Sequence, residues 1–232
     1  MAVAGDPFAR ILVATRSAHK LRELRELLGP IGSHLVSLDE VGIPDEVDET
    51  GATFEANARL KARAYARLSG LATLADDSGI EVDALGGAPG VRTRRYAGEQ
   101  ATDADNNAKL LAALAGLPPE RRGARYVCVL VLARPWVAGR RGGLPLLETR
   151  GTCRGRIASG PRGGGGFGYD PIFEPVGEPP GGRTLGLYSA TEKHAISHRA
   201  RAARRMAARL ARLEDPASLQ GIGRLGDARP GP

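Results

Sequence analysis

The first part of the chain changes from strand-like to helix-like spacing of its apolar residues. Residues 11–14 (ILVA) form a short apolar run, which predicts a strand. Helical spacing follows at Leu21, Leu24, Leu27 and Leu28, and Gly29 with Pro30 ends that helix. The segment ATRSAHK (14–20) between them is therefore predicted to be a strand-to-helix loop carrying hydroxyl and basic side chains.

The same alternation continues over residues 34–119. Strands are predicted at HLVSL (34–38) and LATLA (71–75), and the second leads into Asp76 and Asp77. A helix is predicted from Thr53 to Ser69, with Gly70 as its stop and a face made of Phe54, Ala58, Ala62 and Tyr65. Another helix lies within 101–119: Thr102 and Asp105 have capping-box spacing at its start, and Gly116 with Pro118 closes it.

Extended segments cluster in the later part of the chain. ARYVCVLVLAR (124–134) is almost continuously apolar, which indicates a central strand, and 145–159 indicates one or two more. A final helix is predicted from Glu192 to Leu213, with an apolar stripe of Ile196, Ala203, Ala207 and Leu210. Strands and helices alternate in the first half of the chain, and extended segments cluster later. This order predicts one α/β domain with a mixed sheet.

Composition sets the limits of this domain. The 48 Gly and Pro residues (32 + 16) concentrate in loops and at the C-terminal end, so we expect a domain at 10–214, an extension at 1–9 and a disordered tail at 215–232. No apolar run approaches the ~20 residues that span a bilayer, and no signal peptide is recognisable. With only two cysteines, of which Cys128 is expected to be a buried thiol, we expect a soluble cytoplasmic protein without a membrane partner.

The formal net charge of +7 suits a polyanion, from a nucleotide to a nucleic acid. The densest arginine group is SHRARAARRMAARLAR (197–212) on the predicted final helix. The alternative reading is a solvated arginine-rich helix face.

Two segments suggest phosphate and metal binding. Thr15, Ser17 and Lys20 lie where a strand gives way to a helix, and free N–H groups at a helix N-terminus favour phosphate. The alternative there is a plain N-cap beside a surface lysine. Acids at 45, 46, 48 and 49 precede the helix at Thr53 and could bind Mg²⁺, which prefers carboxylate oxygens, or could simply complement the helix dipole.

Asp76 and Asp77 stand where the predicted strand ends. Neighbouring residues of a strand cannot face the same side, so one carboxylate is expected to point to a site while the other caps the turn or orients its neighbour. A carboxylate there could hold Mg²⁺ or accept a proton from an attacking water. The alternative is an Asp-Asp-Ser-Gly turn.

Two further segments carry candidate recognition groups. Glycine-rich 160–168 leads into Phe167, Tyr169 and Asp170, which suits close backbone approach and stacking on a base, or a hairpin tip anchored by aromatic rings. EKHAISHR (192–199) supplies donors for phosphate or a base carbonyl, or solvated groups on a helix.

Taken together, these motifs resemble the inosine/xanthosine triphosphate pyrophosphatase family over roughly residues 10–212. The matching segments include ETGATFEANARLKARAYA, ADDSGIEVDALGGAPGVRTRRYAGEQATDADN, GGFGYDPIF and EKHAISHR. The resemblance implies an elongated two-lobed α/β fold with a long mixed sheet flanked by helices. It also implies a homodimer and Mg²⁺-dependent cleavage of ITP, dITP and XTP to the monophosphate and pyrophosphate, and no stable nucleic-acid partner.

The resemblance also assigns roles position by position. Asp77 would be the catalytic acid/base and a metal ligand, with Asp48 or Glu49 as the other metal carboxylate. The substrate would be bound by the loop Thr15, Arg16, Ser17, Ala18, His19 and Lys20, by Ser78, by Phe167, Gly168, Tyr169 and Asp170, and by Lys193, His198 and Arg199.

Three departures from the family pattern matter. The usual acidic residue before EK is altered in LYSATEK (187–193), and the other two lie in the predicted phosphate and metal segments. Ser17 replaces the usual Asn of the first loop, and Asp48 replaces a Glu, one methylene shorter. Rival readings are a septum-site type dTTP/UTP pyrophosphatase, whose S-x-S-x-R-R motif ATRSAHK does not match, and a protein that binds nucleotides or nucleic acid without catalysis.

Overall fold

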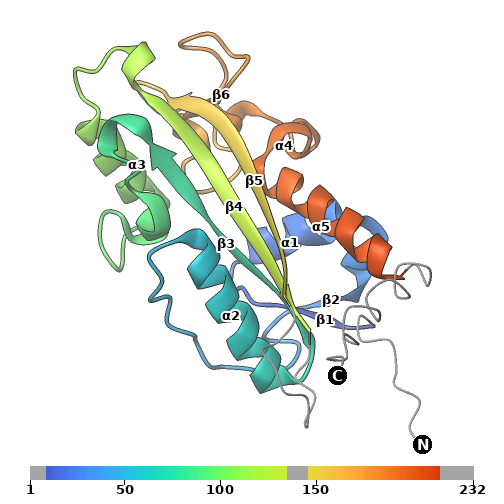
Figure 1. Cartoon of the computed structure of the whole chain (residues 1–232). Coiled ribbons are helices and arrows are strands. Elements are labelled where there is room, and N and C mark those ends of the chain that lie inside the picture. Colours follow the sequence, from blue (N-terminus) through green and yellow to red (C-terminus); the bar gives the residue numbers. More distant parts are fainter. Residues whose placement is uncertain (1–8, 135–145, 215–232) are drawn as a thin grey trace, which may run out of the picture.

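The computed structural model describes residues 9–134 and 146–214, which form a six-stranded sheet with helices on both faces (Figure 1). The expected tail at 215–232 and nearly all of the expected extension at 1–9 lie outside the described residues. No helix within the described part of the chain is long and apolar enough to cross a bilayer.

The sheet is mixed. Its order is β2-β1-β3-β4-β5-β6, in which β1 runs parallel to β2 and β3 while the remaining neighbours are antiparallel. The strands are β1 (Ile11–Val13), β2 (Leu35–Val36), β3 (Ala72–Val82), β4 (Gly123–Ala133), β5 (Leu146–Ile157) and β6 (Phe173–Pro175). The predicted α/β fold with a long mixed sheet is confirmed.

The helices cover the sheet in two layers. They are α1 (Ala18–Leu27), α2 (Phe54–Ser69), α3 (Asp103–Ala113), α4 (Ala190–Ile196) and α5 (His198–Glu214). Leu24 of α1 and Met206 of α5 pack on Leu74 and Leu130 on one face of the sheet. On the other face, α2 packs its apolar stripe against Val127 and the alternate residues of β4. In Figure 1 the long strands β3, β4 and β5 run from this pair of layers to a second cluster around α3 and β6, which makes the molecule elongated.

The helix termini follow the predicted capping chemistry. The Thr53 side chain accepts from Ala56 N–H, and α2 stops at Gly70 in the left-handed region (φ 67°), where glycine has no steric cost. Thr102 and Asp105 form the complete capping box of α3. These ends were predictable because each depends on residues within four positions.

Three predicted boundaries were wrong. The strand predicted to end before Asp76 continues to Val82 as β3, since both carboxylates find buried cationic partners and need no solvent. The strand predicted at 34–38 is only Leu35–Val36. The predicted helix Glu192–Leu213 is two helices, because Ser197 is extended (φ −66°, ψ 154°) and its hydroxyl accepts from Ala200 N–H.

Candidate active site

The candidate site surrounds the edge of β3 where β1 ends. The last register pair of the two strands is Val13 with Leu74, and Ala14 N–H donates to Leu74 O at 2.8 Å. The next carbonyl on that edge, Asp76 O, accepts from the ammonium of Lys61 at 2.8 Å instead of from a strand. Side chains from both faces of the sheet can therefore meet at Asp76 and Asp77.

Asp76 is buried and fully engaged on the α1/α5 face. Its Oδ1 accepts from Lys20 Nζ at 2.5 Å and from Ser78 Oγ at 3.0 Å. Its Oδ2 accepts from Arg199 Nε at 3.0 Å and from Cys128 Sγ at 3.1 Å. Burial opposes ionisation, but Arg199 and Lys20 outweigh it and hold the pKa of Asp76 well below its usual value. Asp76 is therefore a fixed negative charge with little capacity for a further ligand.

Asp77 faces the opposite side and keeps one oxygen unused. Its Oδ1 accepts from Lys61 Nζ at 3.0 Å, and the same ammonium donates to Glu49 Oε1 at 2.6 Å. The Asp77 Oδ2 atom is buried and has no hydrogen-bond partner within the described residues. Burial raises the pKa of Asp77 to about 6 against the opposing charge of Lys61, while Glu49 adds to the increase. This carboxylate can therefore exchange a proton near neutral pH.

Lys61 is a site residue that the sequence reasoning missed. It is buried, and its pKa is raised because the attraction of Asp77 and Glu49 exceeds the cost of burial. The signal was present, since Lys61 lies in the apolar stripe of α2 one helical turn after Ala58. A lysine inside such a stripe requires a buried partner.

The two residues of the acidic pair ahead of α2 differ in exposure. Glu49 is half-buried and lies against Lys61, whereas Asp48 is exposed to solvent. The described residues contain no group of three or more His, Cys, Asp or Glu side chains placed to hold a metal ion. Protein ligands for a cation here would therefore be the carboxylates of Asp77 and Glu49.

The ion-pair network around Asp76 continues through Arg199 and links α1, α4 and α5. Glu23 accepts from Lys193 Nζ at 3.0 Å and also pairs with Arg199. Lys193 Nζ additionally donates to Asp170 Oδ2 at 2.8 Å. Glu23 was also missed, although it lies on the same helix face as Lys20 three residues earlier.

Phe167 lies among the basic groups of this network. The ring of His19 stacks on it at a centroid distance of 5.3 Å, and Lys193 Nζ lies 4.6 Å from the Phe167 centroid. The Arg199 guanidinium is 5.7 Å from the same centroid. An aromatic face is thus presented beside three groups that can donate hydrogen bonds.

The loop that carries Phe167 is held from α3 and from the segment before it. Asp103 Oδ2 accepts from Gly168 N–H at 2.7 Å, and Asn107 Nδ2 donates to Gly168 O at 3.1 Å. The Tyr169 hydroxyl donates to Thr93 O at 2.8 Å. Tyr169 is thereby turned into the core rather than toward Phe167.

The first loop is shaped by its hydroxyls. Thr15 Oγ1 accepts from Ser17 N–H at 3.2 Å, and Ser17 Oγ accepts from Lys20 N–H at 3.4 Å as the N-cap of α1. Ala18 and His19 form the first turn. Arg16 instead turns away, donating to Asp39 Oδ1 and to Ile43 O, both at 2.6 Å.

His198 is buried at the start of α5. Burial, with the nearby charge of Arg199, holds the pKa of His198 well below its usual value, so the imidazole is neutral. Its Nδ1 atom has no hydrogen-bond partner among the described residues.

The structure thus gathers most of the predicted site residues at one edge of β3. Lys20, Ser78, Phe167, Lys193 and Arg199 meet on one side, and Asp77 with Glu49 on the other. Arg16 and Asp48 point elsewhere. The loop at a helix N-terminus, the cationic cluster and the partly unsatisfied carboxylate define the class as an α/β protein with a site for a phosphorylated ligand.

Comparison with known proteins agrees with this class. The chain belongs to the Ham1 family, whose model matches residues 11–209. A relative named dITP/XTP pyrophosphatase from Nocardia farcinica is 49% identical, covering 89% of this chain and 97% of the relative. Another of that name, from an Anaeromyxobacter species, is 48% identical, covering 88% and 97%. The solved HAM1 protein from Coxiella burnetii has a TM-score of 0.75 and 40% identity, covering 87% of this chain and 98% of that one.

Proposed function

We propose that this chain is a nucleoside triphosphate pyrophosphatase that hydrolyses ITP, dITP and XTP to the monophosphate and pyrophosphate. Membership of the Ham1 family and relatives named dITP/XTP pyrophosphatase support this reaction. The observation that carries it is the buried Oδ2 of Asp77, which has no hydrogen-bond partner within residues 9–134 and 146–214 and belongs to a carboxyl group with a pKa of about 6. Removing such non-standard purine nucleotides would cleanse the nucleotide pool.

The carboxylates around Lys61 fit a magnesium ion. Asp77 Oδ2 has no hydrogen-bond partner in the part of the chain that the structure describes. Glu49 contacts the same ammonium, so the two carboxylates supply hard oxygen ligands at one place. Mg²⁺ typically takes only one or two carboxylates and completes its coordination with water and substrate phosphate. We therefore assign Glu49 rather than the exposed Asp48 as the partner of Asp77. When bound, the ion would neutralise phosphate charge.

The phosphates would lie against α1 and Lys193. Ser17 starts α1 as its N-cap, and the first turn of a helix offers N–H groups and a positive dipole end to an anion. Lys20 lies beside Asp76, and Lys193 lies beside Phe167. Each is a cation that can compensate negative charge on the leaving pyrophosphate. Ser17 stands where the family usually has asparagine. Its hydroxyl accepts from Lys20 N–H and caps α1, so serine can fill the capping role at this position.

The proposed chemistry uses Asp77 as general base. Its carboxylate takes a proton from a water molecule as the water oxygen bonds to the α-phosphorus. The bond between the α-phosphorus and the α–β bridging oxygen then breaks, and the electron pair leaves with pyrophosphate. Lys61 keeps Asp77 oriented through the 3.0 Å contact to Oδ1, which leaves Oδ2 for the water or the cation.

Base selection would depend on Arg199 and His198. Three of the five guanidinium N–H groups of Arg199 are used by Asp76, Glu23 and Ser78, which leaves two for an acceptor such as the 6-oxo group of hypoxanthine or xanthine. Adenine carries a donor amine there and would leave these groups unpaired, at a large cost in affinity. The ring of Phe167 would stack on the base. The base would then take the place on this ring that the exposed His19 occupies in the structure.

The test is pyrophosphate release from ITP, XTP, GTP, ATP and dTTP, each with Mg²⁺ and with EDTA. Metal-dependent release from ITP and XTP is the expected result. Release mainly from dTTP would assign the chain to the septum-site type of activity, and no release from any nucleotide would reject catalysis.

Three companion proposals rest on the family rather than on a contact. They are a homodimer, action in the cytoplasm where the nucleotide pool lies, and the absence of a stable nucleic-acid partner. Light scattering and filter binding on the purified chain would test the first and third.

A further inference from the structure

Tyr126 of β4 lies between two residues of the proposed binding site. Its ring stacks on the imidazole of His198 with centroids 4.6 Å apart and planes at 5°. Its hydroxyl donates to Asp170 Oδ1 at 3.3 Å, and Phe173 packs against the ring at a centroid distance of 4.8 Å. Tyr126 is buried and has no direct place in the cluster around Asp77.

Tyr126 contacts one group of each neighbour: the ring of His198 and the Oδ1 atom of Asp170. The Nδ1 atom of His198 has no hydrogen-bond partner among the described residues, and the ring lies flat against that of Tyr126. Asp170 Oδ2 is held by Lys193 and by Phe167 N–H, whereas the hydroxyl of Tyr126 is the one described donor to Oδ1.

Tyr126 therefore controls binding groups separately from the cleavage groups. It lies on the α5 side of the sheet with Cys128, two residues along β4, while Asp77 faces α2. We propose that Tyr126 is a positioning residue that sets the orientation of His198 and Asp170 toward the nucleotide. This inference rests on the proposed function and adds to it a determinant of substrate affinity.

The kinetic test compares Tyr126→Phe with Tyr126→Leu in pyrophosphate release from ITP. The phenylalanine variant keeps the stack and loses one hydrogen bond, so KM should rise by about fivefold at most. The leucine variant loses both contacts, and KM should rise at least roughly tenfold with kcat changed by less than about threefold. Tyr188→Phe is the control, since Tyr188 also donates its hydroxyl to a carboxylate, that of Glu178 at 2.6 Å, and not to Asp170.

Equal effects of the Phe and Leu variants on KM, or an unchanged KM in a folded leucine variant, would overturn the proposal. Histidine NMR keeps the test independent of turnover. The chain has four histidines, so His198→Asn identifies the resonance of His198. That resonance should lose its ring-current shift in Tyr126→Leu and keep it in Tyr126→Phe. If it does so while the wild type hydrolyses nothing, the positioning stands and the proposed function fails.

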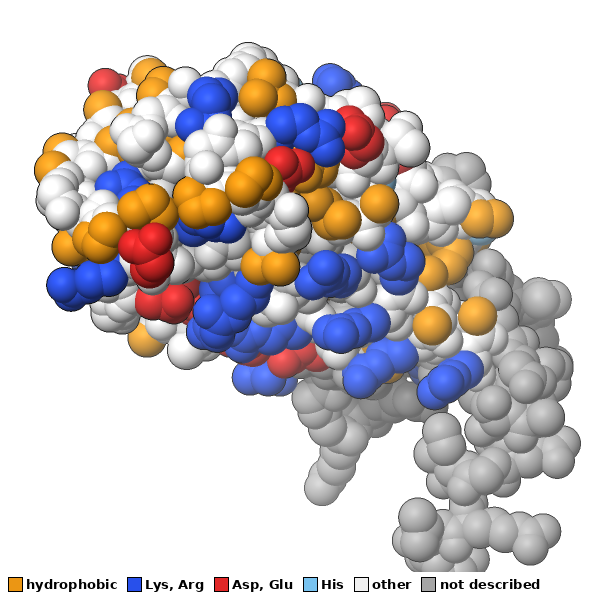
Figure 2. Space-filling model, turned by 90° about the horizontal axis from the view of Figure 1, so that it is seen from above, with side chains coloured by type: hydrophobic (Ala, Val, Ile, Leu, Met, Phe, Trp, Pro, Cys, Tyr) orange, Lys and Arg blue, Asp and Glu red, His pale blue; other side chains and the backbone are white. Residues whose placement is uncertain are grey.

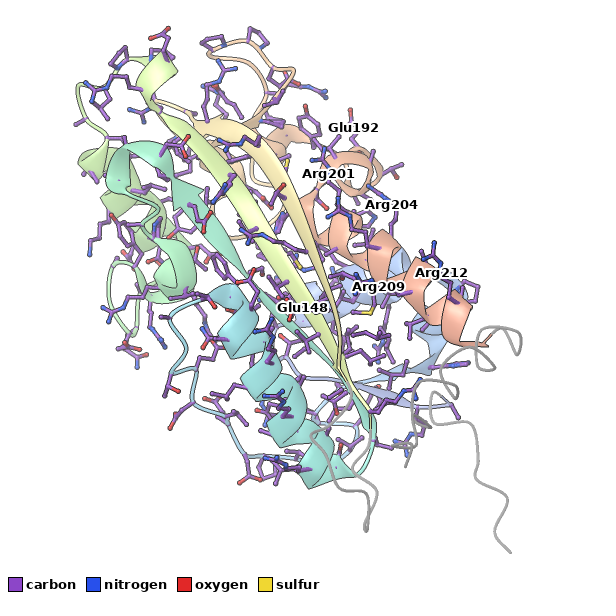
Figure 3. The ribbon with its side chains drawn as sticks, viewed as in Figure 1. Glu148, Glu192, Arg201, Arg204, Arg209 and Arg212 are labelled. Atoms are coloured by element: carbon purple, nitrogen blue, oxygen red, sulfur yellow. The ribbon has the colours of Figure 1, made fainter. Side chains whose placement is uncertain are left out.

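A separate observation concerns the outer edge of β5. Arginines four residues apart on α5 donate to alternate carbonyls of β5: Arg201 to Thr152 O at 2.7 Å, Arg205 to Arg150 O, and Arg209 to Glu148 O at 2.7 Å. Figure 3 labels Arg201 and Arg209 on α5 and Glu148 on β5. Four helical residues advance about 6 Å and two strand residues about 6.8 Å. The two repeats nearly match, so successive helical turns meet successive carbonyls.

These carbonyls lie on the side of β5 away from β4. Farther along the same side, Arg154 O accepts from Val176 N–H at 2.9 Å next to β6. The β6 strand pairs only with residues 155–157. The backbone of β6 begins a row of hydrogen bonds along this edge of β5. The guanidinium groups of α5 continue the row with side-chain donors.

An open strand edge is a template for pairing with another chain. None of Arg201, Arg205 and Arg209 forms an ion pair within the part of the chain that is described, so their charge also stays uncompensated along this edge. A row of Lys and Arg side chains is visible on the surface in Figure 2. We infer that this arginine row closes the edge of β5 against pairing with the same edge of a second copy of the chain.

The test uses two double variants with equal loss of charge from the same helix. Arg205→Met with Arg209→Met removes donors to β5 and keeps apolar stems. Arg204→Met with Arg212→Met is the control, because Arg204 donates to His194 O and Ala195 O of α4 rather than to β5. Light scattering across a concentration series should show species larger than the wild type for the first variant and none for the control.

The same mass distribution in wild type, variant and control would overturn the inference, as would equal association of both variants. Should the double variant not fold, Arg205→Met alone is measured in the same way, with Arg204→Met as its control.

Discussion

Asp76 and Asp77 are adjacent in β3, yet their carboxylates lie on opposite faces of the sheet and have opposite roles. Asp76 accepts from Lys20 and Arg199 and is held ionised. Asp77 accepts from Lys61, has a pKa of about 6, and keeps one oxygen without a hydrogen-bond partner among the residues described. A carboxylate with one oxygen free of hydrogen bonds can take a proton or a cation on that oxygen. The first prediction concerns this difference.

Asp77→Asn should remove turnover and leave the fold intact. The amide cannot accept the proton of the attacking water, and general-base contributions amount to roughly 100-fold to 10,000-fold. The measurement is pyrophosphate release from ITP under saturating Mg²⁺. Asp83→Asn, an exposed acid at the end of the same strand, is the control. Near-wild-type turnover in a folded Asp77→Asn enzyme would remove Asp77 from the mechanism.

Lys61→Met should destabilise the protein. It leaves the buried Asp77 and the half-buried Glu49 without their shared cation, and breaking such a pair costs about 3 kcal/mol. Urea unfolding should show this loss, while Arg63→Met, an exposed position two residues later on α2, should stay within about 0.5 kcal/mol of the wild type. Equal stability of the two variants would mean that Lys61 is not needed for the fold.

Gly151→Ala should shift the start of α5. A Cβ at Gly151 would lie 2.1 Å from His198 O and 2.5 Å from Ala202 N, both backbone atoms that cannot rotate away. We expect a loss of about 1–3 kcal/mol in the free energy of unfolding together with a higher KM, since His198 begins the displaced helix. Gly160→Ala, where the added atom meets nothing within 4 Å, should change neither quantity.

Glu23 should make the stability of the protein sensitive to acid. Burial disfavours its charge, but Arg199 and Lys193 outweigh burial and lower the pKa of Glu23 below its ordinary 4.5. A lowered folded-state pKa stabilises the protein above about 4.5, and this contribution is lost as the pH falls through the folded-state value. The difference in unfolding free energy between wild type and Glu23→Gln should therefore shrink from pH 7 to about pH 3.5. A difference that stays constant with pH would exclude Glu23 as its source.

Local chemistry made much of the fold predictable. The cap residues Thr53 and Thr102, the stop at Gly70 and the apolar stripe of α2 all act within one or two turns, so their consequences could be anticipated. The break at Ser197 was missed although it follows the same local rule, because the apolar stripe runs on through both helices.

The candidate chemistry was also visible in the sequence as residue types and motifs. What the sequence could not supply was the partner of each charge. Arg199 reaches Asp76 across 123 positions, and Lys61 reaches Asp77 from the opposite face of the sheet. Because of these ion pairs, Asp76 and Asp77 can lie in the middle of β3. From the local sequence alone, Asp-Asp-Ser-Gly reads as a turn.

The sequence by itself therefore determined which segments become helices and strands and which groups are available for phosphate and metal chemistry, because these depend on neighbours along the chain. The tertiary structure decided that the charge of Asp76 is paired with Lys20 and Arg199, while Asp77 and Glu49 share Lys61 and Asp77 Oδ2 has no hydrogen-bond partner among the described residues. The reason is that the cost of burying a carboxylate depends on which cations the other helices bring to it.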